Sequence, residues 1–381
     1  MSLISMIGPF AIDTYLPAFP AIEAEFDASR SLLSQTLGAY LAAFAVATLF
    51  WGPITDRFGR KKVIISGISL FIISSIGCAL AKDYSHFLSF RMIQGAAASG
   101  GLVAGRAMVR DVFDSQQARQ VMSYVMLFFA IAPAVAPIIG AGLHDAFGWH
   151  SIFYFLAAFG FVTLLLILAI TKETLALEHR QSIHPRHVTK VYCNVLLHRR
   201  FLMIVTAGSA SFCGMFLFIA GSPTIFFDFL QLTTGDFWKQ FVLMVIGLMA
   251  GSLFSARFAY RKTATRMVSI AVTIIAVTTL INLMIAYFFT PSLLGFVLPL
   301  LCYAFGIGMA IPSLTILALD CFPNNRGTAA AVQSFVQMMA NAIVASIVLP
   351  LVTQSYLAFA VAQLCFISLA VVLWLKVPKT A

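Results

Sequence analysis

One acidic residue, Asp13, lies deep inside a long apolar run. The chain contains 14 Asp and Glu residues, and the others lie near the ends of apolar runs or between them. A carboxylate within a lipid bilayer costs about 3 kcal/mol or more unless it faces a cavity, pairs with a cation or binds a proton. We therefore predict that Asp13 exchanges protons between two environments. A structural acid held by a neighbouring helix is the alternative.

A cation in another apolar run matches this acid. Arg91 lies in the run 86–108, one helical turn before Gln94. A buried arginine requires acceptors, and the candidates are Asp13 or carbonyl groups freed by the prolines of the run 120–143. We predict that Arg91 takes part in proton coupling with Asp13. An arginine that only fixes helix contacts is the alternative.

The composition shows which solvent surrounds these residues. Hydrophobic residues make up 61% of the 381 residues and charged residues only 10%, too few charges to cover a soluble protein of this size. The net charge is +10, but the basic residues form short clusters between apolar runs, as at the cytoplasmic face of a membrane. A soluble enzyme and a nucleic-acid partner are thereby excluded. The six cysteines are scattered, which is typical of apolar filling and not of a disulfide or zinc framework.

Twelve apolar runs are long enough to cross a bilayer as helices, which requires about 20 residues each. Strands of a β-barrel would be shorter and would alternate in polarity, so these runs predict an all-α membrane protein with twelve transmembrane helices. The predicted spans are 2–24, 32–54, 63–82, 86–108, 120–143, 150–171, 201–224, 239–259, 267–289, 293–318, 328–352 and 355–376.

Lys and Arg residues indicate the orientation. Nearly all of the 24 lie on one side if the spans alternate, whereas Arg30, Lys82 and Lys239 lie on the other side. Cytoplasmic loops are enriched in these residues, so we expect a multi-pass protein with both termini in the cytoplasm. The first apolar run begins at Met1. We therefore also expect a late start site or missing N-terminal residues.

The longest loop, 172–200, divides the chain into halves of similar length. GPITDRF at 52–58 is echoed by GSLFSARF at 251–258, and DVF at 111–113 by DCF at 320–322. Two six-helix repeats of the same topology are typical of a transporter whose site lies between the halves near the midplane. We therefore predict an N-terminal six-helix bundle at 1–171, a cytoplasmic linker at 172–200 and a C-terminal six-helix bundle at 201–381.

The loop after the second span, GPITDRFGRKK at 52–62, resembles the signature loop of the major facilitator superfamily. Its glycines permit a tight turn, and Asp56 can accept hydrogen bonds from a helix N-terminus. A basic loop that only sets the topology is the alternative. In an outward-open state we expect Asp56 to approach the start of the eleventh span at 327–330. The predicted gating residues are Asp56, Arg57, Gly59, Arg60, Arg110 and Asp111.

Two further segments resemble motifs of this superfamily. APAVAPIIGA at 132–141 resembles the motif of its drug:proton antiporters and contains Pro133, Pro137 and Gly140. Prolines kink a helix and glycine permits close packing, which we expect against the eighth span; an ordinary proline-kinked helix is the alternative. The segment that begins at Arg91 is similar to the motif of the fourth helix.

DTYLPAFP at 13–20, GP at 52–53 and RDVF at 110–113 resemble the Bcr/CflA branch of bicyclomycin and chloramphenicol resistance exporters. The resemblance covers essentially the whole chain. It implies the major facilitator fold, drug efflux by proton antiport, antibiotic resistance and a bacterial inner membrane, with the acid of the first helix in coupling. Because the branch exports drugs, amino acids and other metabolites, the resemblance assigns no substrate.

A polar stripe marks the eleventh span. Gln333, Gln337 and Asn341 recur every four residues and so share one helix face, which no aqueous surface explains. In transporters of this architecture, spans 1, 2, 4, 5, 7, 8, 10 and 11 line the pathway, so Asn282 in the ninth span is the least expected cavity residue. The predicted substrate cavity consists of Tyr15, Gln35, Tyr40, Gln94, Phe212, Phe216, Tyr303, Gln333, Gln337 and Asn341.

Four histidines, His179, His184, His187 and His198, lie in the central loop. Because Pro185 breaks the local helix and the loop is rich in bases, we expect a solvated linker and no metal site. The chain carries no Walker-type glycine loop for nucleotide phosphates. We therefore expect a proton gradient, and no cofactor, as the energy source.

These patterns favour a proton-coupled secondary transporter that exports small amphipathic molecules by alternating access, and not an enzyme. One alternative is a dedicated exporter or importer of an endogenous metabolite such as a siderophore. Another is a non-transporting membrane receptor; flux in proteoliposomes distinguishes these classes. We expect a monomer whose partners are small-molecule substrates, protons and the lipid bilayer.

Overall fold

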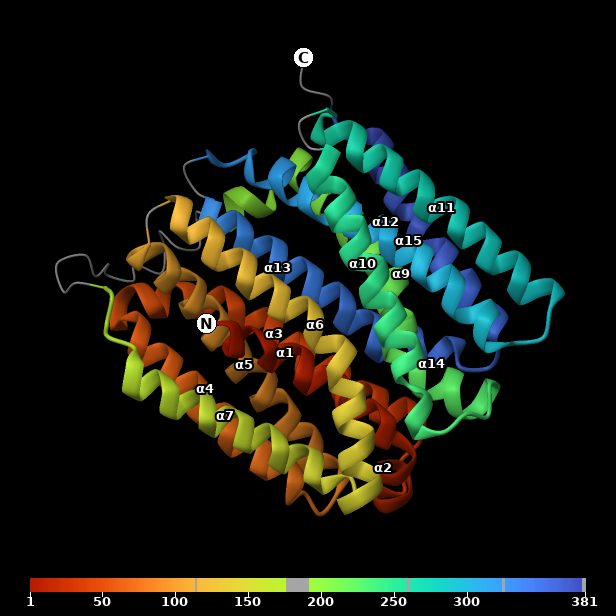
Figure 1. The fold of residues 1–381 in the computed structure, drawn as a ribbon, viewed down its shortest axis with the longest axis horizontal. Helices are drawn as coiled ribbons and strands as arrows, with labels where there is room; N and C mark the ends of the chain where they lie inside the picture. The colour runs from red at the N-terminus through yellow and green to blue at the C-terminus, as the bar shows by residue number, and fades with distance from the viewer. Residues whose placement is uncertain (114, 176–191, 259–260, 324–325, 379–381) are drawn as a thin grey trace. The chain divides into compact units, whose positions relative to one another are not determined.

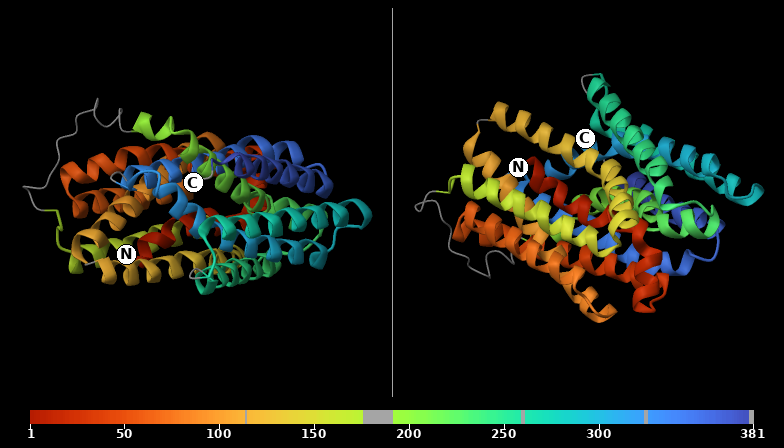
Figure 2. Two further views of the ribbon diagram at one scale, coloured as in Figure 1. Left: turned by 90° about the horizontal axis from the view of Figure 1, so that it is seen from above. Right: turned by 60° about the horizontal axis from the view of Figure 1, so that its bottom comes forward.

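A computed structural model describes residues 1–113, 115–175, 192–258, 261–323 and 326–378 (Figures 1 and 2). All regular structure in these ranges is helical. Ten of the helical segments described there are long and apolar enough to cross a membrane. The chain divides into two compact units, Met1–Thr189 and Lys190–Ala381.

The first unit contains a broken first span and five long helices. In Figure 1 and both views of Figure 2, α4 and α7 run side by side, in agreement with their many contacts. The elements are α1 (Ser2–Asp13), η1 (Leu16–Ala18), α2 (Phe19–Phe26), α3 (Arg30–Phe58), α4 (Arg60–Ala79), α5 (Tyr84–Val112), α6 (Ser115–Phe147) and α7 (His150–Ile170).

The prediction of one continuous helix over 2–24 is wrong. Helix α1 ends at Asp13 because Pro17 has no N–H to donate to the Asp13 carbonyl, the next bond of a continuing helix. Pro17 and Pro20 instead stand at the beginnings of η1 and α2, where a missing N–H is tolerated. The break therefore lies at Asp13, the acid that the sequence singles out.

The second unit has the same order of long helices. One departure lies in the predicted span 328–352, where α13 continues into a π-helical turn before Pro350, whose missing N–H disturbs a regular α-helix. The elements are α9 (Arg199–Ala220), η3 (Thr224–Phe229), η4 (Thr234–Asp236), α10 (Trp238–Phe258), α11 (Ala264–Phe288), α12 (Leu293–Leu319), α13 (Arg326–Ile343), η6 (Val344–Val348), α14 (Leu349–Val352) and α15 (Tyr356–Lys376).

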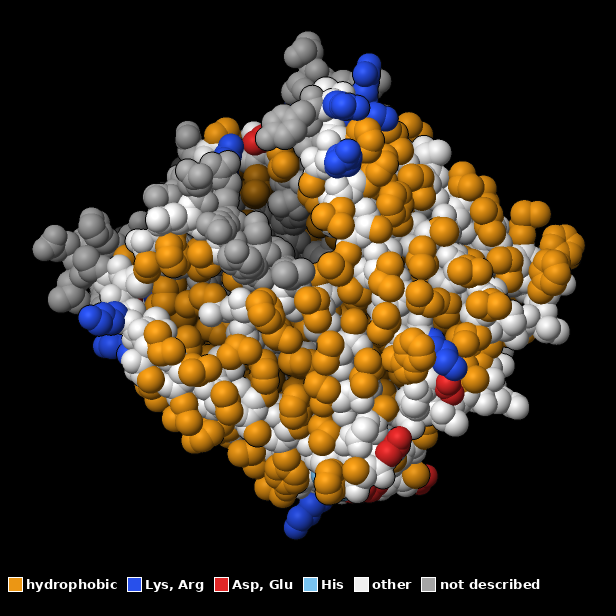
Figure 3. Space-filling model, viewed as in Figure 1, with side chains coloured by type: hydrophobic (Ala, Val, Ile, Leu, Met, Phe, Trp, Pro, Cys, Tyr) orange, Lys and Arg blue, Asp and Glu red, His pale blue; other side chains and the backbone are white. Residues whose placement is uncertain are grey.

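The outer surface of the helices is apolar. On the face shown in Figure 3, hydrophobic side chains cover the helices, and charged side chains lie mainly toward their ends. Large hydrophobic residues such as Phe161 and Leu253 are more than half exposed. A surface of this kind suits contact with lipid, not with water.

Candidate functional site

Asp13 is the last residue of α1 and is only 4% exposed. Its Oδ1 atom is buried without a hydrogen-bond partner, and within the described ranges no cation forms an ion pair with the carboxyl group. An unpaired buried carboxylate is costly. Asp13 therefore lies in the first span without a partner that would offset the cost of its charge.

Arg91, on α5, is fully buried. Its Nη1 donates to the Ala11 carbonyl at 3.0 Å and to Gln94 Oε1 at 2.5 Å. The Ala11 carbonyl lies in the last turn of α1, where carbonyl groups have no partner within the helix, and a cation is favoured there by the helix dipole. The expected acceptors, Asp13 or carbonyls freed by the prolines of α6, are thus replaced by a carbonyl of the first span.

Two tyrosine rings cover the Arg91 guanidinium. Its central carbon lies 4.4 Å from the ring centroid of Tyr15 and 4.5 Å from that of Tyr40, and both rings are fully buried. Cation–π contacts are strongest where water is excluded. They stabilise the charge of Arg91 without an acidic partner.

This arrangement separates the role of the Tyr40 ring from that of its hydroxyl group, which is buried without a hydrogen-bond partner. Tyr40→Phe should be nearly neutral because it keeps the ring above Arg91. Tyr40→Leu should reduce the free energy of unfolding by about 2 kcal/mol more than Tyr40→Phe, through loss of the cation–π contact. Thermal unfolding of the two purified variants in detergent measures the difference. Equal unfolding temperatures would contradict the prediction.

Helix α6 closely approaches the break in the first span at Gly140. A Cβ atom at Gly140 would lie 1.8 Å from the Thr14 carbonyl oxygen, far inside contact distance. Pro133 and Pro137 lie in the same helix, before Gly140 in the sequence. The geometry within the first unit therefore gives Gly140 a partner in the first span, whereas the expected packing against the eighth span stays a prediction.

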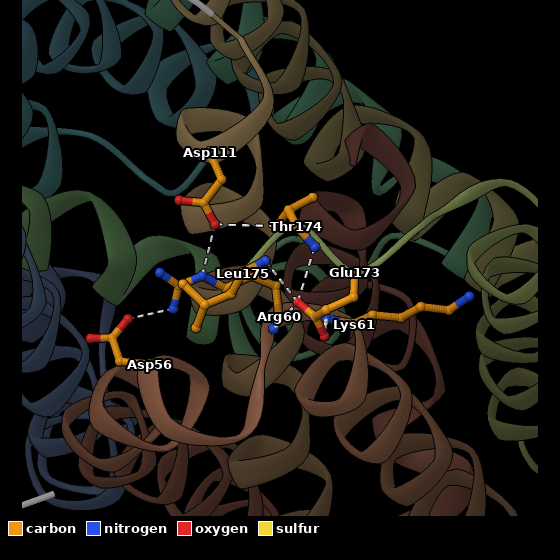
Figure 4. A network of polar contacts seen from close by, with 7 residues as sticks. All are labelled: Asp56, Arg60, Lys61, Asp111, Glu173, Thr174 and Leu175. Atoms are coloured by element: carbon orange, nitrogen blue, oxygen red, sulfur yellow. Dashed lines mark hydrogen bonds and ion pairs between the residues drawn. The ribbon is translucent and has the colours of Figure 1, made fainter. Parts of the chain in front are cut away.

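The loop between α3 and α4 gathers charged residues (Figure 4). Arg60 forms ion pairs with Asp56 and, through Nε, with Asp111 Oδ2 at 2.9 Å. Arg57 is exposed, with its guanidinium over the Phe58 ring. The side chain of Arg110 lies outside the described residues. Three of the predicted gating residues thus form one network within the first unit.

Glu173 belongs to this network and was missed by the sequence analysis. Its Oε1 accepts the N–H of Arg60 at 2.9 Å and its Oε2 the N–H of Lys61 at 3.2 Å. The adjacent Thr174 donates its hydroxyl to Asp111 Oδ2 at 3.2 Å. The only signal in the sequence was an acid directly after the sixth apolar run.

The polar stripe of the eleventh span lies on α13. Gln333 Nε2 donates to Thr315 Oγ1 at 3.1 Å, and Gln337 Nε2 donates to Asn341 Oδ1 at 3.3 Å. Asn341 is buried, while the two glutamines are half-buried. On α9, Phe212 is half-buried and Phe216 is buried. The stripe is therefore partly open and carries amide groups along one helix.

The remaining cavity candidates have mixed environments. Tyr303 is fully buried and donates to the Ser211 carbonyl at 2.7 Å. Gln94 is also fully buried, and its Nε2 donates to Ser75 Oγ at 2.8 Å. Gln35 is half-buried on α3. In this conformation Tyr303 and Gln94 act as internal hydrogen-bonding groups of their units.

A second polar cluster lies inside the second unit. Asn282 Nδ2 donates to Gln363 Oε1 at 2.9 Å, and the Tyr356 hydroxyl donates to Asn282 Oδ1 at 2.8 Å. Gln363 Nε2 also donates to the Gly214 carbonyl at 3.4 Å. Asn282 thus joins α11 to α15 through these hydrogen bonds. Gln363 and Tyr356 were not singled out from the sequence.

Of the four central histidines, His198 lies within the described residues. His179, His184 and His187 lie outside the described residues. His198 is the N-cap residue of α9, where its Nδ1 accepts the N–H of Phe201 at 3.2 Å. This histidine therefore has a local role at the start of a helix.

Comparisons with known proteins agree with the fold. The family model described as Major Facilitator Superfamily matches residues 1–345. The crystal structure of a D-xylose-proton symporter matches with a TM-score of 0.76 at 17% identity, covering 100% of this chain and 99% of that chain. The predicted fold class, an all-α membrane protein with twelve helices in two six-helix repeats, is confirmed.

Curated relatives match over most of the chain. An uncharacterized MFS-type transporter, YdgK, of Bacillus subtilis is 31% identical and covers 91% of this chain and 87% of its own length. The bicyclomycin resistance protein homolog of Haemophilus influenzae is 28% identical, with coverage of 91% and 87%. The multidrug resistance protein MdtL of Escherichia coli O17:K52:H18 is 30% identical, with coverage of 89% and 84%.

These matches confirm the resemblance carried by the signature loop and by the segment around Asp13. The relatives and structural neighbours are transporters and not enzymes, so the receptor and enzyme classes are set aside. The chain is a multi-pass membrane transporter and belongs to the Major Facilitator Superfamily.

Proposed function

We propose that this transporter exports small amphipathic molecules in exchange for protons, by alternating access. The observation that carries the proposal is Asp13, a buried and unpaired carboxyl group at the break of the first span. Such a group favours a bound proton when it is shielded from water and releases it when water or a cation reaches it. Alternation between two such states couples proton movement to transport.

Arg91 supports this role by fixing the end of α1. Its bond to the Ala11 carbonyl lies two residues before Asp13, and the two tyrosine rings hold the guanidinium in place. Because Arg91 has these partners, it does not neutralise Asp13 in the present conformation. The proton gradient is the energy source, and the proposal requires no cofactor.

The names of the relatives support the kind of cargo. Two of them are named for multidrug resistance and for bicyclomycin resistance. A bacterial inner membrane is the corresponding location, and the distribution of Lys and Arg favours both termini in the cytoplasm. We infer a monomer, since each unit buries its own core.

The amide stripe of α13 supports a neutral or weakly charged cargo. Gln333, Gln337 and Asn341 offer donors and acceptors without net charge. Phe212 lies on α9 beside Cys213, whose Sγ donates to Asn341 Oδ1 at 3.6 Å. Such a lining binds varied molecules by hydrogen bonds and apolar contact. An anionic cargo would instead need Arg91, which is fully buried here.

Flux in proteoliposomes tests the proposal. An outward-acidic pH gradient should drive export of chloramphenicol or ethidium, while protons move in the opposite direction. Proton-driven flux in the import direction would show that the protein is an importer and not an exporter. Transport of a single endogenous metabolite, with neither probe moved, would favour a dedicated exporter.

Substitution of the amide stripe should alter selectivity. Gln337→Ala or Asn341→Ala removes hydrogen-bonding groups worth about 1 kcal/mol each, so relative affinities for chemically distinct ligands should change about fivefold. Proton release on binding should persist, because Asp13 lies in the other unit. Binding and proton release are measured together for both variants. Unchanged selectivity in both variants would show that the stripe is not part of the binding site.

A further inference from the structure

The N-terminus of α4 has no cap of its own. Gly59 occupies the N-cap position and offers no side chain to the first N–H groups of the helix. The first four N–H groups of any helix require acceptors from elsewhere. In α4, the N–H groups of Arg60 and Lys61 are bonded by the two carboxylate oxygens of Glu173, at 2.9 and 3.2 Å. The cap therefore comes from the chain directly after α7.

Gly59 has no side chain and so leaves space for this carboxylate. Its φ is +101°, a conformation that L-residues rarely adopt, and a Cβ atom there would lie 2.4 Å from Glu173 Oε2. Gly148 also has a positive φ, +79°, but a Cβ atom there would meet nothing within 4 Å. A side chain at Gly148 would therefore strain the backbone without a collision. Gly59 is thus required by its backbone conformation, and a side chain there would push the Glu173 carboxylate away from the start of α4.

The corresponding helix of the second unit is capped differently. Thr263 precedes α11, and its side chain accepts the N–H of Arg266 at 3.4 Å. A local hydroxyl cap in one unit therefore replaces the distant carboxylate cap of the other.

Glu173 also fixes the chain that leaves α7. Its Oε1 accepts the N–H groups of Thr174 at 3.0 Å and of Leu175 at 3.1 Å. Figure 4 shows these residues beside Arg60 and Asp111. The chain directly after α7 is thereby held at the signature loop.

We propose that Glu173, directly after α7, is a positioning residue that caps α4 and so holds Arg60 between Asp56 and Asp111. A carboxylate is favoured at a helix N-terminus by the dipole and by the free N–H groups. With its backbone held by Glu173, Arg60 keeps its side chain within reach of both acids. These contacts lie within the first unit and are independent of the direction and the cargo of transport.

Hydrogen exchange provides the direct test. In the purified full chain, Glu173→Ala should accelerate exchange of the Arg60 and Lys61 amides roughly 3- to 30-fold, the factor expected for loss of a helix cap. Glu173→Gln should restore part of the protection, because its carbonyl oxygen can still accept one of the two bonds. Thr263→Ala is the matched control and should accelerate exchange only at the start of α11. Unchanged exchange at residues 60 and 61 in Glu173→Ala would overturn the proposal.

A double-mutant cycle tests the fit of Gly59. Gly59→Ala should lower the unfolding temperature more than Gly148→Ala does, since only the former collides with the carboxylate. In a Glu173→Ala background, the effect of Gly59→Ala should fall to that of Gly148→Ala. An equal effect of Gly59→Ala in both backgrounds would contradict the fit. If the Gly59 variants cannot be purified, exchange in Glu173→Ala decides alone.

Discussion

Asp13→Asn is expected to abolish transport driven by a pH gradient, with a loss of about 100-fold or more, as for removal of a proton-transferring group. Asparagine has nearly the same shape but cannot bind and release a proton. Because Oδ1 of Asp13 has no hydrogen-bond partner, the free energy of unfolding should change by less than about 1 kcal/mol. Uphill flux and thermal unfolding of the variant measure the two effects.

Asp27→Asn is the matched control. Asp27 is exposed and adopts a left-handed conformation with φ 48°, which asparagine tolerates well. Its substitution should leave proton-driven flux unchanged. Full uphill transport by Asp13→Asn would remove this residue from coupling, and loss of flux in both variants would point to a general effect of charge.

Gly140→Ala should have the second large effect. The new methyl group would lie 1.8 Å from the Thr14 carbonyl oxygen, so α6 or the break in the first span must move. A backbone oxygen cannot rotate away as a side chain can, and overpacking of this kind costs about 1–3 kcal/mol or more. We expect a lower unfolding temperature and a strong loss of transport, since the displaced segment directly follows Asp13.

Gly142→Ala gives the comparison within the same helix. A Cβ atom at Gly142 would meet nothing within 4 Å, and alanine is favoured over glycine in a helix by about 1 kcal/mol. Gly142→Ala should therefore keep or raise stability, whereas Gly140→Ala lowers it. Thermal unfolding and flux of the pair measure the contrast, and similar values for both would show that α6 does not need its close contact with Thr14.

The apolar runs predicted the helices because a bilayer imposes a minimum length and excludes unpaired backbone groups. The break after Asp13 was not predicted, although Pro17 and Pro20 were visible. Prolines also occur inside helices without ending them, such as Pro9 in α1 and Pro299 in α12. Which proline ends a helix depends on the contacts around it, here the approach of Gly140 to Thr14.

The site residues show the same limit. Asp13 and Arg91 could be selected from the sequence because charge is rare inside a span. The partner of Arg91 could not, since the Ala11 carbonyl becomes free only where α1 ends. Glu173 was missed because its partners lie 113 residues earlier and are backbone groups, which leave no mark in the sequence.

The distant cap of α4 also sets an order of events during biosynthesis. The loop at residues 59–61 emerges from the ribosome 113 residues before Glu173, which corresponds to roughly 10 s of synthesis. During that interval the start of α4 has no carboxylate cap, whereas Thr263 precedes α11 and is made before it. The first unit thus completes its signature loop only when its sixth span has been inserted, so a ribosome stalled before residue 173 would leave this loop open to insertion or quality-control factors.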